Sequence, residues 1–117
     1  MGIYVTKSLA MNREKTGALV FTKGKLLGSI IRIKEEKEII IGRDAARSDV
    51  VVDAKTVSRL HCKVVYHKTS GKYTVIDCSK NGVFRGDGRR LPANEEVEVA
   101  SGEELWLGNE ENALRLG

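Results

Sequence analysis

The sequence predicts an all-β protein, a β-sandwich of short and mostly antiparallel strands. Apolar runs of about three to six residues recur along the chain, and turn residues separate them about every eight to twelve residues. Residues 73–78 alternate between two faces, which is the pattern of a half-buried strand. No segment has a sustained helical period, and the chain contains 1 proline. These features favour a sandwich or barrel over alternating strands and helices.

The first half of the chain divides into strands by its glycines and charged turns. Lys23-Gly24 ends a β-rich segment, and Gly42 ends a run of three isoleucines. A charged turn at residues 34–37 separates two further apolar segments. The strands expected here are residues 18–22, 28–33, 39–41 and 50–52.

The second half continues the same pattern to the end of the chain. Gly86-Asp87-Gly88 indicates a tight hairpin between two strands. Trp106 lies between two leucines, and we expect it to be a core residue. The strands expected here are residues 61–66, 73–78, 83–85, 89–91, 97–99, 104–107 and 113–116.

The chain has room for one domain. At 117 residues it is near the commonest domain size. We expect an N-terminal arm or linker over residues 1–17 and the sandwich over residues 18–117. The apolar runs are only a few residues long, whereas a membrane-spanning helix needs about 20 apolar residues.

Two cysteines, Cys62 and Cys78, are too few for a disulfide scaffold or a zinc site. Both lie in apolar, strand-like surroundings, so we expect small buried thiols in a reducing environment. No apolar signal segment is visible at the N-terminus. We therefore expect a cytoplasmic location.

The positive charge is concentrated in the middle of the chain. Residues 43–91 carry eleven Lys and Arg against five Asp, whereas residues 92–117 carry one Arg against seven Glu. An anionic partner for the middle segment follows as a hypothesis. Nucleic acid is one such partner on charge alone, but only 5% of residues are aromatic and no basic amphipathic helix is present.

Three polar side chains in this basic segment have the chemistry of a phosphate site. Arg43 follows one predicted strand, Ser58 precedes another, and Asn81 follows a third. A phosphorylated side chain carries about −1.5 to −2 charge and three acceptor oxygens. An arginine fork donates two parallel hydrogen bonds to it, a hydroxyl adds a neutral donor, and an amide can hold the neighbouring peptide backbone. We expect three loops at one end of the sandwich to converge on a phosphate.

Four motifs extend this pattern along most of the chain. They are Gly42-Arg43, Val57-Ser58-Arg59-x-His61, Asp77-x-Ser79-x-Asn81-Gly82 and Gly102-x3-Trp106-Leu107-Gly108. In order and spacing they resemble the forkhead-associated (FHA) domain, over about residues 21–117. The resemblance implies an eleven-stranded β-sandwich, without a cofactor, that binds phosphothreonine peptides or proteins through loops at one end. It also implies a monomeric reader in Ser/Thr kinase signalling, in some cases as part of a larger protein.

The resemblance also assigns roles to single residues. Arg43 and Ser58 would contact the phosphate, and Asn81 would hold the peptide backbone beside it. Arg59 would contact the phosphate or the peptide. Support for the site would come from three further residues, Gly42, His61 and Gly82, with His61 holding the loop of Ser58.

The chain departs from the family pattern at Lys80 and Val83. Many relatives have Ser or Thr where Lys80 stands, so we expect Lys80 to meet the phosphate as a point charge instead of through a hydroxyl. Val83 stands where relatives often have Thr. Selectivity for the flanking peptide would come from Lys55, Thr56 and the turn after Val83.

The sequence also contains residue types of other classes of function. Ser58, His61 and Asp77 are the residue types of a hydrolase triad, but no nucleophile elbow, phosphate-binding loop or metal-spaced cluster accompanies them. We therefore expect a binding module and not an enzyme, with no metal site and no membrane or nucleic-acid partner. The first alternative is a scaffold sandwich that binds partners independently of phosphate, and the second is nucleic-acid binding through the basic residues 43–91.

Overall fold

The computed structural model describes residues 16–117, which form ten strands and no helix. The predicted arm, residues 1–17, lies outside the described residues except for Thr16 and Gly17, and Gly17 already belongs to β1. The strands are β1 (Gly17–Lys23), β2 (Ile30–Ile33), β3 (Ile39–Gly42), β4 (Val50–Val51), β5 (Cys62–His67), β6 (Lys72–Asp77), β7 (Val83–Arg85), β8 (Glu96–Val99), β9 (Glu104–Leu107) and β10 (Asn109–Leu116). Nothing in residues 16–117 forms a helix long and apolar enough to span a membrane.

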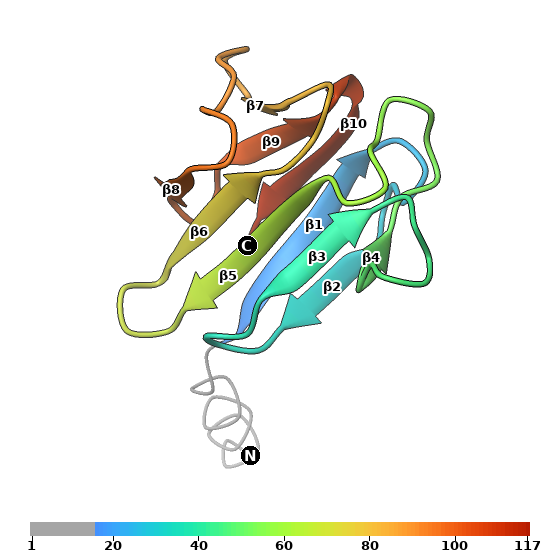
Figure 1. Cartoon of the computed structure of the whole chain (residues 1–117). Helices are drawn as coiled ribbons and strands as arrows, with labels where there is room; N and C mark the ends of the chain where they lie inside the picture. Colours follow the sequence, from blue (N-terminus) through green and yellow to red (C-terminus); the bar gives the residue numbers. More distant parts are fainter. Residues whose placement is uncertain (1–15) are drawn as a thin grey trace.

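The strands form two sheets of five, stacked as two layers (Figure 1). One sheet has the order β2-β1-β10-β9-β7, and the other has the order β4-β3-β5-β6-β8. The short β3–β4 pair is parallel, and the other pairs are antiparallel. The predicted all-β sandwich of mostly antiparallel strands is confirmed. The FHA resemblance implies eleven strands, and residues 16–117 contain ten.

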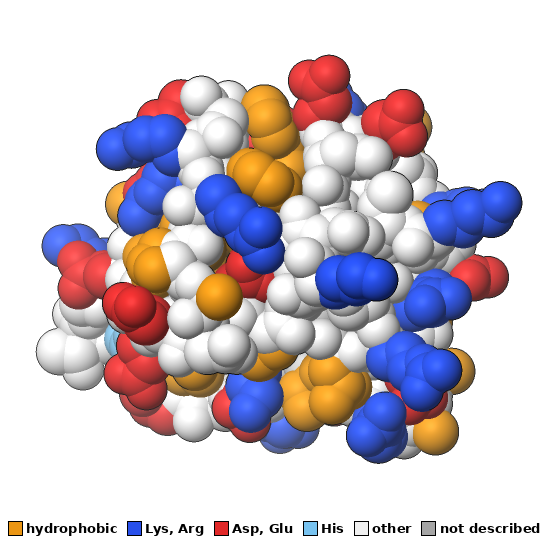
Figure 2. All heavy atoms as spheres, turned by 45° about the horizontal axis from the view of Figure 1, so that its top comes forward, with side chains coloured by type: hydrophobic (Ala, Val, Ile, Leu, Met, Phe, Trp, Pro, Cys, Tyr) orange, Lys and Arg blue, Asp and Glu red, His pale blue; other side chains and the backbone are white. Residues whose placement is uncertain are grey.

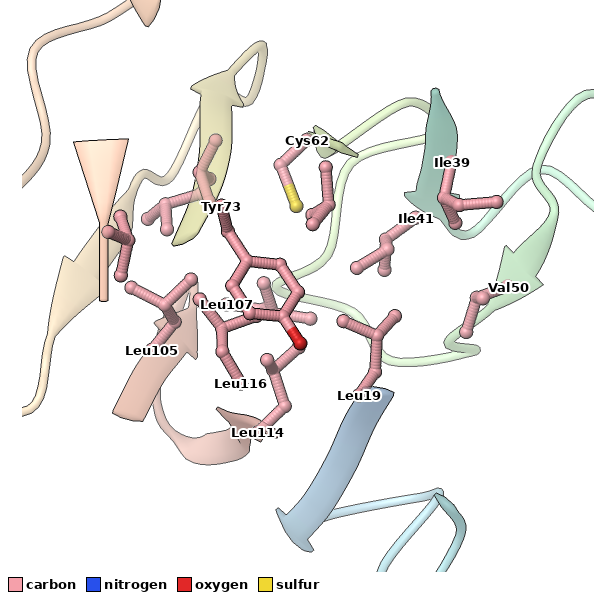
Figure 3. Packing of buried hydrophobic residues seen from close by; sticks show 14 of the residues in the cluster. Leu19, Ile39, Ile41, Val50, Cys62, Tyr73, Leu105, Leu107, Leu114 and Leu116 are labelled. Atoms are coloured by element: carbon pink, nitrogen blue, oxygen red, sulfur yellow. The ribbon is translucent and has the colours of Figure 1, made fainter. Parts of the chain in front are cut away.

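The core lies between the sheets because alternate side chains of each strand point inward. On β6, Tyr73 and Val75 are fully buried, as the alternation of residues 73–78 predicts. Figure 3 shows the Tyr73 ring next to Leu116 of the facing sheet. The Tyr73 hydroxyl accepts the Ala18 N–H at 2.9 Å and donates to the Gly117 carbonyl. The one polar atom of this ring is therefore paired, and it ties the two sheets together.

Three expectations from the sequence need correction. Trp106 is not a core residue: Leu105 and Leu107 of β9 point inward, so Trp106 lies on the outer face, half-buried, with its indole N–H on Glu104. Cys62 is buried as expected, but Cys78 follows the end of β6 and is only partly buried; both thiols are free.

The predicted strand at residues 89–91 is absent. The turn after β7 forms as expected, since Arg85 donates its N–H to the Arg89 carbonyl at 2.8 Å. Beyond it a single bridge joins Phe84 and Arg90, and Leu91 donates its N–H to the Val83 carbonyl at 2.8 Å. The Val83 N–H donates to the Asp77 carboxylate and not back to residue 91, so the ladder does not continue into a strand.

Candidate functional site

Three loops leave the sheet from one row of paired residues. In the β4-β3-β5-β6-β8 sheet, Ile41 pairs with Cys62, and Cys62 pairs with Asp77. Arg43 follows the first of these strands, Ser58 precedes the second, and the loop to β7 follows the third. The middle strand runs opposite to its neighbours, so all three loops emerge at the same end. Figure 2 turns this end toward the viewer, and Lys and Arg side chains stand at several places across it.

Arg43 is fixed to the loop that carries Ser58. Its backbone N–H donates to the Ser58 carbonyl at 2.9 Å, and its Nε donates to the Val57 carbonyl at 3.0 Å. The two terminal nitrogens of the guanidinium make no hydrogen bond to any of residues 16–117. Arg43 is thus an exposed cation with a fixed orientation and donors left for a ligand.

Arg59 lies beside Arg43. Both side chains line an open hollow of about 360 Å³, together with Asp44 and Ala45. Asp44 is hydrogen-bonded to Arg47, and that bond lowers the pKa of its carboxyl. Arg47 therefore compensates the negative charge of Asp44, and the positive charges of Arg43 and Arg59 remain in the hollow.

Arg43 also borders a second hollow. This hollow has a volume of about 560 Å³ and is mixed in charge. Its lining residues are Gly24, Lys25, Arg43, Asp53, Ala54, Lys55, Glu111 and Asn112. A ligand held at Arg43 can therefore extend into either hollow.

Gly42 and Gly82 allow backbone approaches that no other residue permits. A Cβ on Gly42 would lie against the carbonyl of Arg59, far inside van der Waals contact. Gly82 has φ of +100°, and a Cβ there would lie 2.8 Å from Nε of Arg90. These two predicted support positions are therefore explained by close packing and, at Gly82, by a left-handed backbone.

His61 joins two of the loops from a fully buried position. Its Nδ1 accepts the Ser58 backbone N–H at 3.0 Å, so the proton is assigned to Nε2, which donates to the Gly82 carbonyl at 2.8 Å. Burial lowers the pKa of His61, which keeps the ring neutral. The Ser58 hydroxyl does not meet the imidazole, so the pair lacks the contact that activates a serine nucleophile.

Lowering the pH from about 7.5 to about 5.5 is expected to destabilise the fold through His61. As the pH falls through about 6.5, the unfolded chain protonates this histidine while the folded chain does not. The unfolded state then binds more protons, so the free energy of unfolding decreases. Thermal unfolding at the two pH values measures the change.

The test of this effect is the variant that lacks the ring. His61→Gln should reduce the pH dependence of the free energy of unfolding. An unchanged pH dependence in His61→Gln would contradict the assignment. Two-dimensional NMR of the wild-type imidazole rings gives an independent readout. The His61 ring should remain neutral near pH 6.5.

The side chains of Ser58 and Asn81 are each hydrogen-bonded to the backbone of the other's loop. The Ser58 hydroxyl oxygen accepts the Lys80 N–H at 3.0 Å, which leaves its own O–H to donate outward. Asn81 donates one amide hydrogen to the Thr56 carbonyl at 3.0 Å, and its other hydrogen and its oxygen point to no partner in residues 16–117. The Lys80 side chain is exposed, and its ammonium contacts no acid in the same residues.

A buried carboxylate closes the loop that carries Asn81. Asp77 is fully buried; one oxygen accepts both the N–H and the hydroxyl of Ser79, and the other accepts the Val83 N–H at 3.1 Å. The Ser79 hydroxyl oxygen in turn accepts the Gly82 N–H at 2.7 Å. This network fixes the backbone on both sides of Asn81.

The sequence prediction missed several supporting residues. Asp77 and Ser79 could have been found, because Asp followed two residues later by Ser at a strand end is typical of a side chain that caps a turn. Asn112 is buried and donates to the Thr56 hydroxyl at 3.4 Å, and no local pattern indicates that contact across 56 residues. Arg90 was likewise not predicted to border Gly82.

The geometry thus brings the predicted residues together at one end of the sandwich, and a comparison with known families identifies the pattern. Residues 39–108 match the FHA domain. The chain belongs to the FHA domain family. The match includes all three loops described above.

Similar proteins share the FHA fold. The FHA domain-containing protein FHA1 of Arabidopsis thaliana is 32% identical over 79 residues; the match covers 62% of this chain, which spans 32% of that protein's length. The FHA domain of CT664 from Chlamydia trachomatis has a TM-score of 0.74 at 22% identity, covering 87% of this chain and 96% of that one. The MEK1 FHA domain, solved in complex with a pThr peptide of HOP1, has a TM-score of 0.68 at 19% identity, covering 86% and 93%.

Proposed function

We propose that this FHA domain binds proteins or peptides that carry phosphothreonine and acts as a reader in Ser/Thr kinase signalling. The observation that carries the proposal is the Arg43 guanidinium, held by the Val57 carbonyl at 3.0 Å with its terminal donors turned to solvent. Family membership supports it, as does the pThr peptide bound by the MEK1 FHA domain.

Each loop contributes one kind of contact to the phosphopeptide. The Arg43 fork donates to two phosphate oxygens. The Ser58 hydroxyl donates to a third, because its own acceptor position is taken by the Lys80 N–H. Asn81 uses its second amide hydrogen and its oxygen to bind the peptide backbone beside the phosphothreonine.

Arg59 and Lys80 add charge to the same site. Arg59 shares the 360 Å³ hollow with Arg43 and meets the phosphate or the adjacent peptide from that side. Lys80 replaces a hydroxyl donor with a mobile ammonium, which attracts the phosphate as a point charge. Such a contact is less directional and more sensitive to salt than a buried hydroxyl contact.

A titration with matched peptides tests the proposal. We expect a phosphothreonine peptide library to bind with micromolar affinity, since two or three charge-assisted hydrogen bonds of about 1.5–3 kcal/mol each suffice for that range. The phosphoserine and unphosphorylated libraries should bind far more weakly. Equal affinity for phosphorylated and unphosphorylated peptides would instead indicate a phosphate-independent scaffold.

A further inference from the structure

We propose that Arg90 and Lys80 form a second anion subsite beside the phosphothreonine site, which takes an acidic side chain of the same ligand. The chemistry is that of a carboxylate or of a second phosphate. This inference rests on the proposed function. It concerns the part of the Asn81-Gly82 loop against which Arg90 lies.

Arg90 is held in place by contacts on several sides. Its guanidinium lies over the Phe84 ring, 6.0 Å from the ring centre, and its Nη2 donates to the Lys80 carbonyl at 3.5 Å. Gly82 has no side chain, which gives the guanidinium room to lie against the loop. Arg90 is therefore pre-oriented, so a ligand has to immobilise less of it on binding.

The charge of Arg90 is only partly compensated within the protein. Its nearest acid is Asp77, whose oxygen lies 3.8 Å from Nε and already accepts the Val83 N–H. The two other arginines of this hairpin have closer partners: Arg85 lies 2.7 Å from Glu103, and Arg89 lies 2.8 Å from Asp87. Arg90 is thus the arginine of this hairpin whose charge is least compensated, and its side chain is 45% exposed.

Lys80 carries a second positive charge, on a residue whose backbone contacts Arg90. Its ammonium contacts no acid within residues 16–117, while its carbonyl accepts from Arg90. Arg90 and Lys80 together carry two positive charges against the single carboxylate of Asp77, which leaves net positive charge for an anion. An arginine and a lysine together suit a carboxylate or a phosphate, since the arginine gives direction and the lysine gives charge.

The subsite is close enough to the phosphate site for one short peptide to reach both. The Lys80 N–H lies on the Ser58 hydroxyl at 3.0 Å, and the carbonyl of the same residue lies 3.5 Å from Arg90. The path from Ser58 Oγ to Arg90 is therefore at most about 10 Å, which an extended chain covers in about three residues. We expect the acidic residue one to three positions from the phosphothreonine.

A peptide scan tests this subsite by calorimetry. The parent peptide carries one phosphothreonine between neutral residues, and Asp is placed in turn at each of the three positions on either side. Wild type should bind one or two of the Asp peptides about three- to tenfold more tightly than the parent. A second series with phosphoserine at those positions distinguishes the two sources of the anion, and the tighter series identifies the preferred one.

The variants separate the subsite from general charge effects. Arg90→Gln should reduce the gain from Asp to less than about twofold, and Arg90→Lys should keep part of it. Arg89→Gln is the matched control. It removes the same charge from the same hairpin, but the side chain that it removes is already paired with Asp87. Lys80→Gln should weaken the gain further when combined with Arg90→Gln.

The outcomes also separate this inference from the proposed function. If phosphothreonine peptides bind but Asp brings no gain at any position, or if Arg90→Gln keeps the full gain, the subsite is ruled out and the reader function stands. If no phosphothreonine peptide binds wild type, both are overturned. Thermal unfolding of Arg90→Lys and Arg90→Gln checks that the loop is intact.

Discussion

Arg43→Ala is expected to abolish phosphothreonine-peptide binding, with a loss of affinity of at least about 100-fold. The substitution removes two charge-assisted hydrogen bonds to the phosphate, each worth about 1.5–3 kcal/mol, together with the positive charge that borders both hollows. Calorimetric titration of one phosphothreonine peptide against wild type and variant measures the loss.

The loss should arise from the missing guanidinium and not from unfolding. Within the protein, Arg43→Ala removes the single side-chain hydrogen bond to the Val57 carbonyl, which contributes about 0.5–1.5 kcal/mol. That is a small part of the roughly 5–15 kcal/mol typical of a folded domain. The midpoint of thermal unfolding should therefore change by only a few degrees.

Two further variants decide which property of Arg43 matters. Arg43→Lys keeps the charge but loses the fork and the Nε contact, so we expect an intermediate loss of about tenfold or more. Arg89→Ala removes the same charge from the hairpin after β7, where its partner is Asp87 at 2.8 Å, and should bind nearly as well as wild type. A loss in Arg89→Ala equal to that in Arg43→Ala would mean that only net charge steers the ligand.

The strands of this domain could be predicted from the sequence because each has one buried face. The alternation of Tyr73, Thr74 and Val75 on β6 follows directly from the two-residue period of a strand. The same reasoning failed for Trp106, because hydrophobicity does not say which face of a strand a residue occupies. The register of Leu105 and Leu107 on β9 assigns the tryptophan to the outer face.

The site could be predicted as a set of residues but not as a network. Arg43, Ser58 and Asn81 lie beside strand ends that a single sequence reveals. The contacts that hold them are tertiary: His61 reaches the Gly82 carbonyl across 21 residues, and Asn81 reaches the Thr56 carbonyl across 25. Such pairs depend on which strand ends lie in one row of the sheet, and no local pattern encodes that.

Asp77→Ala is expected to cost about 3–5 kcal/mol of folding free energy, the largest effect on stability among the site residues. The carboxylate is fully buried and accepts hydrogen bonds from Ser79 and from the Val83 backbone. Alanine leaves these donors without their partner, and each one that stays buried and unpaired costs about 1–3 kcal/mol. Urea unfolding of wild type and variant measures the difference.

The effect should extend to ligand binding, because the same network fixes the backbone around Asn81. Asp77→Asn keeps the shape but turns one acceptor into a donor that faces an N–H or hydroxyl group, so we expect an intermediate loss of stability. Asp87→Ala is the control: Asp87 also accepts the N–H two residues later, from Arg89 at 3.0 Å, but in an exposed turn. Its removal should cost less than about 1 kcal/mol. If Asp77→Ala costs no more than Asp87→Ala, the buried network does not hold the loop, and the position of Asn81 must depend on its own bond to the Thr56 carbonyl.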